Sequence, residues 1–162
     1  MSVSLWTGKI LGQVKDHLES NLPAALTAIA SDGGATVAPP SAYAVQDDID
    51  SASQLPFLAV RTAGVTSSTD MMPASYRLQI PLEVVCVCSP EANPKTPDLA
   101  ARTTARGILN VLTSDAFQLA VDGVYWVGDP ATEIERLDDD AHRWRRMAVC
   151  EVTLYVATTR TV

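Results

Sequence analysis

Hydrophobic and polar residues alternate most regularly over residues 74–88, and this stretch sets the expected fold. The positions on one side are all apolar: Tyr76, Leu78, Ile80, Leu82, Val84, Cys86 and Cys88. The positions between them are mostly polar up to Glu83 and apolar from Val85 onward. Such alternation predicts a β-strand with one buried face. A one-residue shift in its pairing would expose that face at a cost on the order of 10 kcal/mol. We therefore expect this strand at the centre of an antiparallel sheet.

Three other stretches have strand patterns. Residues 55–62 predict a strand joined to the central one by a long hairpin loop, residues 63–73. Residues 124–137 have strand character, interrupted by a bulge or a kink at the Gly-Asp-Pro segment. A turn at 138–140 then leads to the last strand, residues 142–158. Its apolar face is interrupted by Arg146, whose long side chain we expect to reach solvent.

Helical spacing is clear in two places. Leu11, Val14 and Leu18 share one face of an expected helix over residues 4–21. Pro23 either breaks this helix or opens a second short segment, residues 24–30, at the first helical position.

A second helix is expected over residues 97–113, with Asp98 in its first turn. Arg102 and Arg106 lie four residues apart on this helix, so their guanidinium groups can bind the same carboxylate or phosphate. A solvated face is the alternative interpretation.

These elements predict one domain over residues 1–162. Its class is α+β, with a central antiparallel or mixed sheet of about four strands, two main helices on one face and long hairpin loops. Residues 31–54 form an irregular loop in which Tyr43, Val45 and Ile49 alternate and indicate a short strand.

Composition excludes some classes of function. The net charge is -7, so the chain gains little from binding phosphates, although DNA could slide past it without sticking. The N-terminus lacks the pattern of a signal peptide, and no apolar run is long enough to cross a membrane. We therefore expect a protein made in a cytosol that does not contact a membrane.

The candidate chemical groups are few. The three cysteines, Cys86, Cys88 and Cys150, fall in apolar strand patterns that favour core packing. A metal site is the alternative, but a fourth ligand at suitable spacing is missing. Acidic residues 138–140 next to His142 could bind a metal or move a proton, but a hairpin tip is too exposed for such chemistry. We expect no enzyme activity and no cofactor.

The order of elements resembles the tail terminator proteins of tailed bacteriophages, the lambda U-like group. The segments that carry the resemblance are the helix through Leu11, Val14 and Leu18, residues 55–60, the strand 77–88, the helix 98–112 and the closing strand 145–155. The resemblance implies a homo-oligomeric ring, usually of six subunits, that ends polymerisation of the tail tube and joins the tail to the head. It also implies a virion protein assembled in the host cytoplasm, with tail tube protein and head–tail connector protein as partners and DNA as passing cargo.

Contacts with other subunits or with the tube are expected in the loops and on the polar face of the sheet. The candidate residues are Met71, Met72, Arg77, Glu83, Asp138, Asp139, Asp140, Arg143, Arg145 and Glu151. Met71 and Met72 have an alternative role in packing back onto the sheet. The irregular loop at 31–54 is longer than is typical of the group.

Two other functions remain open at this point. One is a different neck or head-completion protein of the same particle. The other is a small α/β enzyme or ligand-binding module, which would need a pocket lined by convergent polar groups between the helices and the sheet.

Overall fold

A computed structural model describes residues 3–45, 55–62, 66–68, 75–88, 97–138 and 144–159. Its α+β class is the one that the sequence predicts. The elements in chain order are α1 (Val3–Ser31), β1 (Ala42–Val45), β2 (Phe57–Thr62), β3 (Thr66–Ser68), β4 (Ser75–Val87), α2 (Pro97–Leu112), α3 (Asp115–Ala120), β5 (Val124–Asp138) and β6 (Trp144–Thr159).

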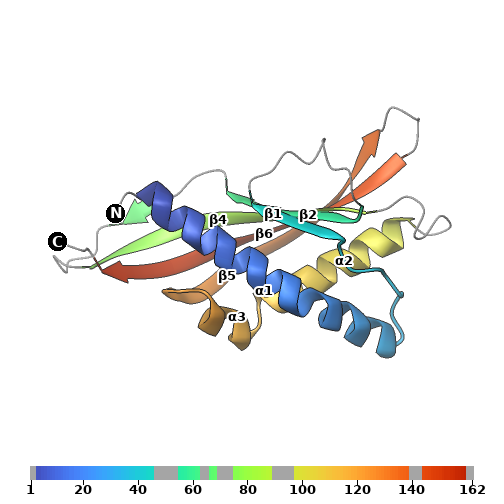
Figure 1. Cartoon of the computed structure of the whole chain (residues 1–162), viewed down its shortest axis with the longest axis horizontal. Helices are drawn as coiled ribbons and strands as arrows, with labels where there is room; N and C mark the ends of the chain where they lie inside the picture. Colours follow the sequence, from blue (N-terminus) through green and yellow to red (C-terminus); the bar gives the residue numbers. More distant parts are fainter. Residues whose placement is uncertain are drawn as a thin grey trace.

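The sheet has β4 in its middle, as expected. The strand order is β1-β2-β4-β6-β5, and the short β3 pairs separately with β4 (Figure 1). β1 runs parallel to β2 and the other pairs are antiparallel, so the sheet is mixed. The sequence predicts about four strands, and the two further ones are short. β1 contains Tyr43 and Val45 of the expected short strand, whereas Ile49 lies outside the described residues. β3 lies in the segment expected to be a loop.

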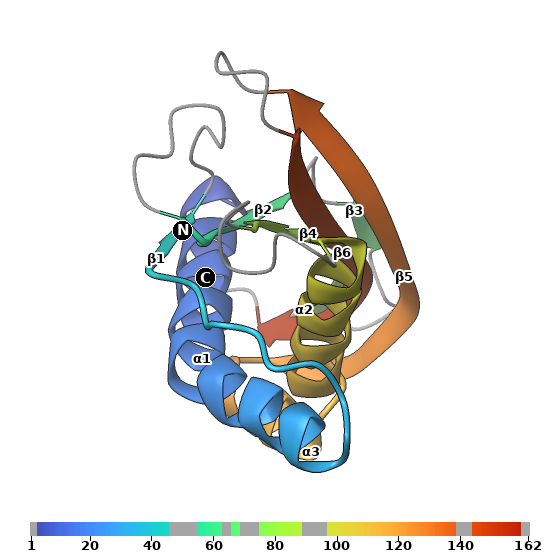
Figure 2. The same ribbon diagram turned by 90° about the vertical axis from the view of Figure 1, so that its right-hand side faces the viewer.

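The two main helices cover one face of the sheet. Figure 2, which looks along the strands, shows α1 and α2 side by side within the curve of the sheet. The even-numbered side chains that the structure describes, from Leu78 to Cys86 in β4 and from Arg146 to Val156 in β6, point toward these helices and are buried, as the alternation predicts. The apolar layer between sheet and helices includes Leu11, Val14, Leu18, Leu22, Leu82, Ile108, Leu112 and Leu154.

Pro23 does not break the first helix. α1 is continuous over 29 residues, and Pro23 lies inside it. The buried Leu22 and Leu26 flank the proline and pack into the same core. Burial of these two side chains offsets the backbone hydrogen bond that a proline in a helix interior forfeits. The helix instead ends after Ser31, where Gly33 adopts φ +89° in a glycine-dependent turn.

Arg146 is buried, contrary to the expectation that it reaches solvent. Its side chain is only 10% exposed, and its Nε donates a hydrogen bond to a carboxylate oxygen of Asp98 in the first turn of α2. This contact holds the start of α2 against β6. It also lowers the pKa of Asp98, because the guanidinium favours the charged carboxylate.

α1 and α2 approach closely at Gly107. A Cβ atom built there would lie 2.8 Å from Cδ2 of Leu26 and 3.3 Å from Cδ1 of Leu22. The absence of a side chain at Gly107 therefore allows the two helices to share one core.

We expect Gly107→Val to lower the free energy of unfolding by about 1–3 kcal/mol, because the new methyl groups overpack the helix contact. Gly12→Val is the matched control. Gly12 also lies in a helix, but a Cβ there meets no atom within 4 Å. The control should leave stability unchanged or raise it by about 0.3 kcal/mol through helix propensity. Urea unfolding followed by circular dichroism measures both, and equal effects would contradict the close approach.

Candidate functional site

The face of the sheet turned away from α1 and α2, here called the open face, carries the most distinctive side chains. One end of it is apolar and buried: Val85, Val87, Met147 and Val149 form a cluster separate from the main core. The rest of the face is more exposed and carries charged and aromatic groups. Of the candidate contact residues, Arg77, Glu83 and Glu151 all lie there, at odd-numbered positions of β4 and β6.

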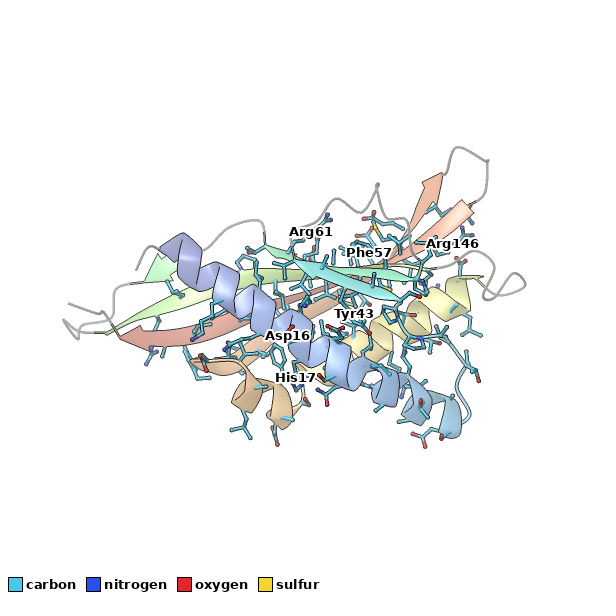
Figure 3. All side chains as sticks on the ribbon, in the orientation of Figure 1. Asp16, His17, Tyr43, Phe57, Arg61 and Arg146 are labelled. Carbon is cyan, nitrogen blue, oxygen red and sulfur yellow. The ribbon has the colours of Figure 1, made fainter. Side chains whose placement is uncertain are left out.

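A row of charges crosses the middle of the open face. Arg61 of β2, Glu83 of β4 and Glu151 of β6 are register partners on three neighbouring strands. Arg61 donates a hydrogen bond from Nε to Glu83, and Figure 3 shows Arg61 on the side of the sheet away from α1. Glu151 is exposed and makes no hydrogen bond or ion pair within the described part of the chain. The row therefore ends in a free carboxylate.

Glu151 faces a second carboxylate and a small neighbour. Like charges directly opposite each other on paired strands cost about 0.2–1 kcal/mol. On its other side, Glu151 is opposed by Ala131 of β5, whose methyl group is too short to cover it. Glu83, Glu151 and Asp129 line the same shallow hollow, of about 390 Å³. Among the lining residues that the structure describes, Arg61 is the only cation and faces three carboxylates, so this lining is negatively charged overall.

Aromatic side chains extend the open face beyond the charged row. Trp126 stacks on Tyr155 with ring centroids 4.7 Å apart, and the guanidinium of Arg77 lies 5.5 Å from the ring centroid of Tyr125. Trp126 is 53% exposed and Tyr125 is 44% exposed. We call Arg77, Tyr125, Trp126 and Tyr155 the aromatic patch.

The bulge of β5 makes room for the aromatic patch. A Cβ atom at Gly128 would lie 3.2 Å from both Trp126 and Tyr155. Asp129, which follows it, has φ 53° and accepts a hydrogen bond from the hydroxyl of Tyr155 at 3.2 Å. Partial burial and the carboxylate of Asp129 raise the pKa of Tyr155. The expected Gly-Asp-Pro bulge is therefore present and positions the stack.

A second surface lies between α2 and β5. Arg102, Arg106 and Asn110 of α2 face Thr132 and Glu133 of β5 across a groove of about 610 Å³, which we call the arginine groove. The side chains of Arg102 and Arg106 are exposed on the same side of the helix.

Several predicted contact residues cannot be compared with this geometry. Met71, Met72, Asp139, Asp140 and Arg143 lie outside the described residues, as does His142. Asp138 and Arg145 are placed as strand positions near the β5–β6 turn, in register with Trp144 and Leu137.

Sequence analysis missed Arg61, Trp126 and Asp129 as members of the site. The consecutive Tyr125 and Trp126 before the Gly-Asp-Pro bulge were a usable signal, because a bulge re-aims neighbouring side chains.

The three cysteines are free and buried. Cys150 lies with Sγ 3.5 Å from the carbonyl oxygen of Ala105, and burial raises its pKa to about 12. Hydrogen bonding with the thiol of Cys88, followed by burial, raises the pKa of Cys86, whereas the same hydrogen bond lowers the pKa of Cys88. Within the described residues, no group of three or more His, Cys, Asp and Glu side chains is placed to hold a metal ion. These contacts are those of core thiols.

His17 packs in a structural role. Its ring meets Phe117 of α3 edge-on, with centroids 5.6 Å apart, and it lies 3.3 Å from the amide of Asn21. Partial burial lowers its pKa.

Comparison with known proteins gives no family. No protein-family model matches the chain, and a search of curated proteins finds no match. Among the described helices, none has the length and apolar character needed to span a lipid bilayer.

We expect all three thiols to resist modification in the native protein. At about pH 8, an aromatic disulfide reagent should react slowly with the folded chain and rapidly with the urea-unfolded chain, because burial keeps the reagent away from the three sulfur atoms. The absorbance of the coloured leaving group gives the number of cysteines that have reacted. Equal rates in the folded and unfolded protein would place at least one thiol on the surface.

Proposed function

We propose that this protein is a structural component of a phage virion that acts as a tail terminator. In this proposal it forms a homo-oligomeric ring, ends tail tube polymerisation and contacts the head–tail connector. The order of elements that resembles the lambda U-like group gives the initial support. The protein then works by its surfaces and needs no catalytic group.

The observation that carries the proposal is the composition of the open face. Exposed tryptophan, tyrosine and arginine gather in the aromatic patch, and these residue types dominate the binding energy of protein interfaces. The patch is rigid, because its rings stack on one another and lie on long paired strands. A rigid aromatic surface loses little conformational entropy on association.

The charge balance agrees with a conduit for DNA. A net charge of -7 repels phosphates, so DNA passing through a ring would not be retained.

The ligand-binding alternative finds less support. A small-molecule site of that kind would need polar groups between the helices and the sheet. Apolar side chains such as Leu18, Leu82 and Ile108 fill this layer. The hollow beside Glu83 lies on the open face. The arginine groove does lie between a helix and the sheet, but at the edge strand β5 and outside this apolar layer.

Purified protein should assemble into rings. We expect a molar mass of about six times 17.3 kDa by light scattering after size exclusion, and ring-shaped particles with a central channel in negative-stain images. Added tail tube protein should bind the ring and stop growing. A strict monomer at high concentration, with no ring even in the presence of tube protein, would rule the proposal out.

Truncating the centre of the aromatic patch should weaken assembly. Trp126→Ala is expected to cost about 2 kcal/mol or more per contact, because buried tryptophan anchors dominate interfaces. Leu119→Ala is the matched control, since Leu119 is an apolar residue 89% exposed on α3, outside the patch. Sedimentation at several concentrations measures both variants. Assembly of Trp126→Ala at wild-type concentrations would place the patch in solvent.

A further inference from the structure

Two arginines of α2 stand apart from the other basic residues. Arg102 and Arg106 make no hydrogen bond or ion pair within the described part of the chain. The other basic side chains that the structure describes each interact with a partner: Lys9, Lys15, Arg61, Arg77, Arg136 and Arg146. In a chain of net charge -7, two adjacent unpaired guanidiniums are the exception.

The surroundings of these arginines do not neutralise them. Glu133 is the acidic residue that lines the arginine groove, so the groove keeps a net positive charge. In the first turn of α2, Arg146, Arg136 and Arg102 all contribute to lowering the pKa of Asp98. Asp98 is thus shared among three arginines, with Arg146 as its hydrogen-bond partner, so it offsets the charge of Arg102 only in part. An arginine fork matches a carboxylate in shape and charge.

The open face presents the complementary charge. Glu151 is exposed at the end of the charged row and opposes Glu83, which already has Arg61 as its partner. A guanidinium arriving from outside would find space above Ala131. It would then complete the row and relieve the like-charge pair. The chain itself offers no cation for this position among the described side chains.

We propose that copies of this protein associate head to tail, with the arginine groove of one copy holding Glu151 of the next. Arg102 and Arg106 bind the free carboxylate, and the aromatic patch lies on the same face as part of the contact. Because the two surfaces differ, the contact is heterologous, and repetition of such a contact closes into a ring when the rotation between copies permits. The inference rests on the proposed function and names the surfaces that would build its ring.

Charge-reversal variants test this pairing in the full chain. Both E151R and R102E/R106E should assemble at least about tenfold more weakly than the wild type, because each places like charges across the contact. E151R should keep its fold, since the new cation faces Glu83 within the same sheet. R102Q/R106Q removes the charge without reversing it, in case R102E/R106E folds poorly. D32R, a reversal at the exposed end of α1, is the control and should assemble normally.

Mixing gives the decisive measurement. In an equal mixture of E151R and R102E/R106E, a ring in which the two variants alternate has opposite charges at every contact. The unchanged arginine groove of E151R meets the unchanged Glu151 of R102E/R106E, and the reversed groove of R102E/R106E meets the reversed charge of E151R. Light scattering should therefore show assembly restored to within about threefold of wild type. The triple variant E151R/R102E/R106E should recover in the same way. Rescue in both cases would establish the pairing.

Other results would overturn the inference. Normal assembly of E151R, or of R102E/R106E, would show that the contact does not use these charges. Weakened variants that neither the mixture nor the triple variant rescues would mean that these surfaces do not meet each other. Short duplex DNA bound at low salt by the wild type and lost in R102E/R106E, with assembly unchanged, would assign the groove to phosphates. A monomeric wild type would instead overturn the proposed function itself.

Discussion

The pairing of β4 with β6 is the interaction on which the rest of the structure depends. The two strands stay in register from Ser75 opposite Thr159 to Val87 opposite Met147, without a bulge. This unbroken pairing puts the even-numbered side chains that the structure describes on the face toward the helices and the odd-numbered ones on the open face. A shift by one residue would move the apolar side chains to the open face and the polar ones into the core. The alternation in the sequence therefore specifies this strand register.

Among the described elements, the helices cover one face of the sheet and leave the open face without a helix. α1 and α2 share a core made possible by Gly107, and together they bury the even-numbered face. The open face then changes character along its length, from a buried apolar cluster through the charged row to the aromatic patch. A surface with unpaired charge and exposed rings is suited to binding another protein.

The distribution of charge gives that surface a direction. An acidic chain in which most of the described cations are already paired has few ways to form a basic surface, and α2 provides one. Charge complementarity between unlike surfaces favours one orientation of approach and penalises the others. A closed ring needs such a directional contact, whereas its inner wall only needs to repel the DNA that passes through.

Sequence by itself determined the α+β class, the central strand, the β5–β6 hairpin, the bulge of β5 and the face on which Arg77, Glu83 and Glu151 lie. These features follow from side-chain periodicity and local backbone preferences, which act over a few residues. Only the tertiary structure decided that Pro23 stays inside α1, that Arg146 is buried against Asp98, and that Arg61 aligns with Glu83. Each depends on groups far apart in the chain. Burial of Leu22 and Leu26 outweighs the local helix-breaking effect of Pro23. The register between strands, which no single segment encodes, brings the charged and aromatic side chains of the open face together.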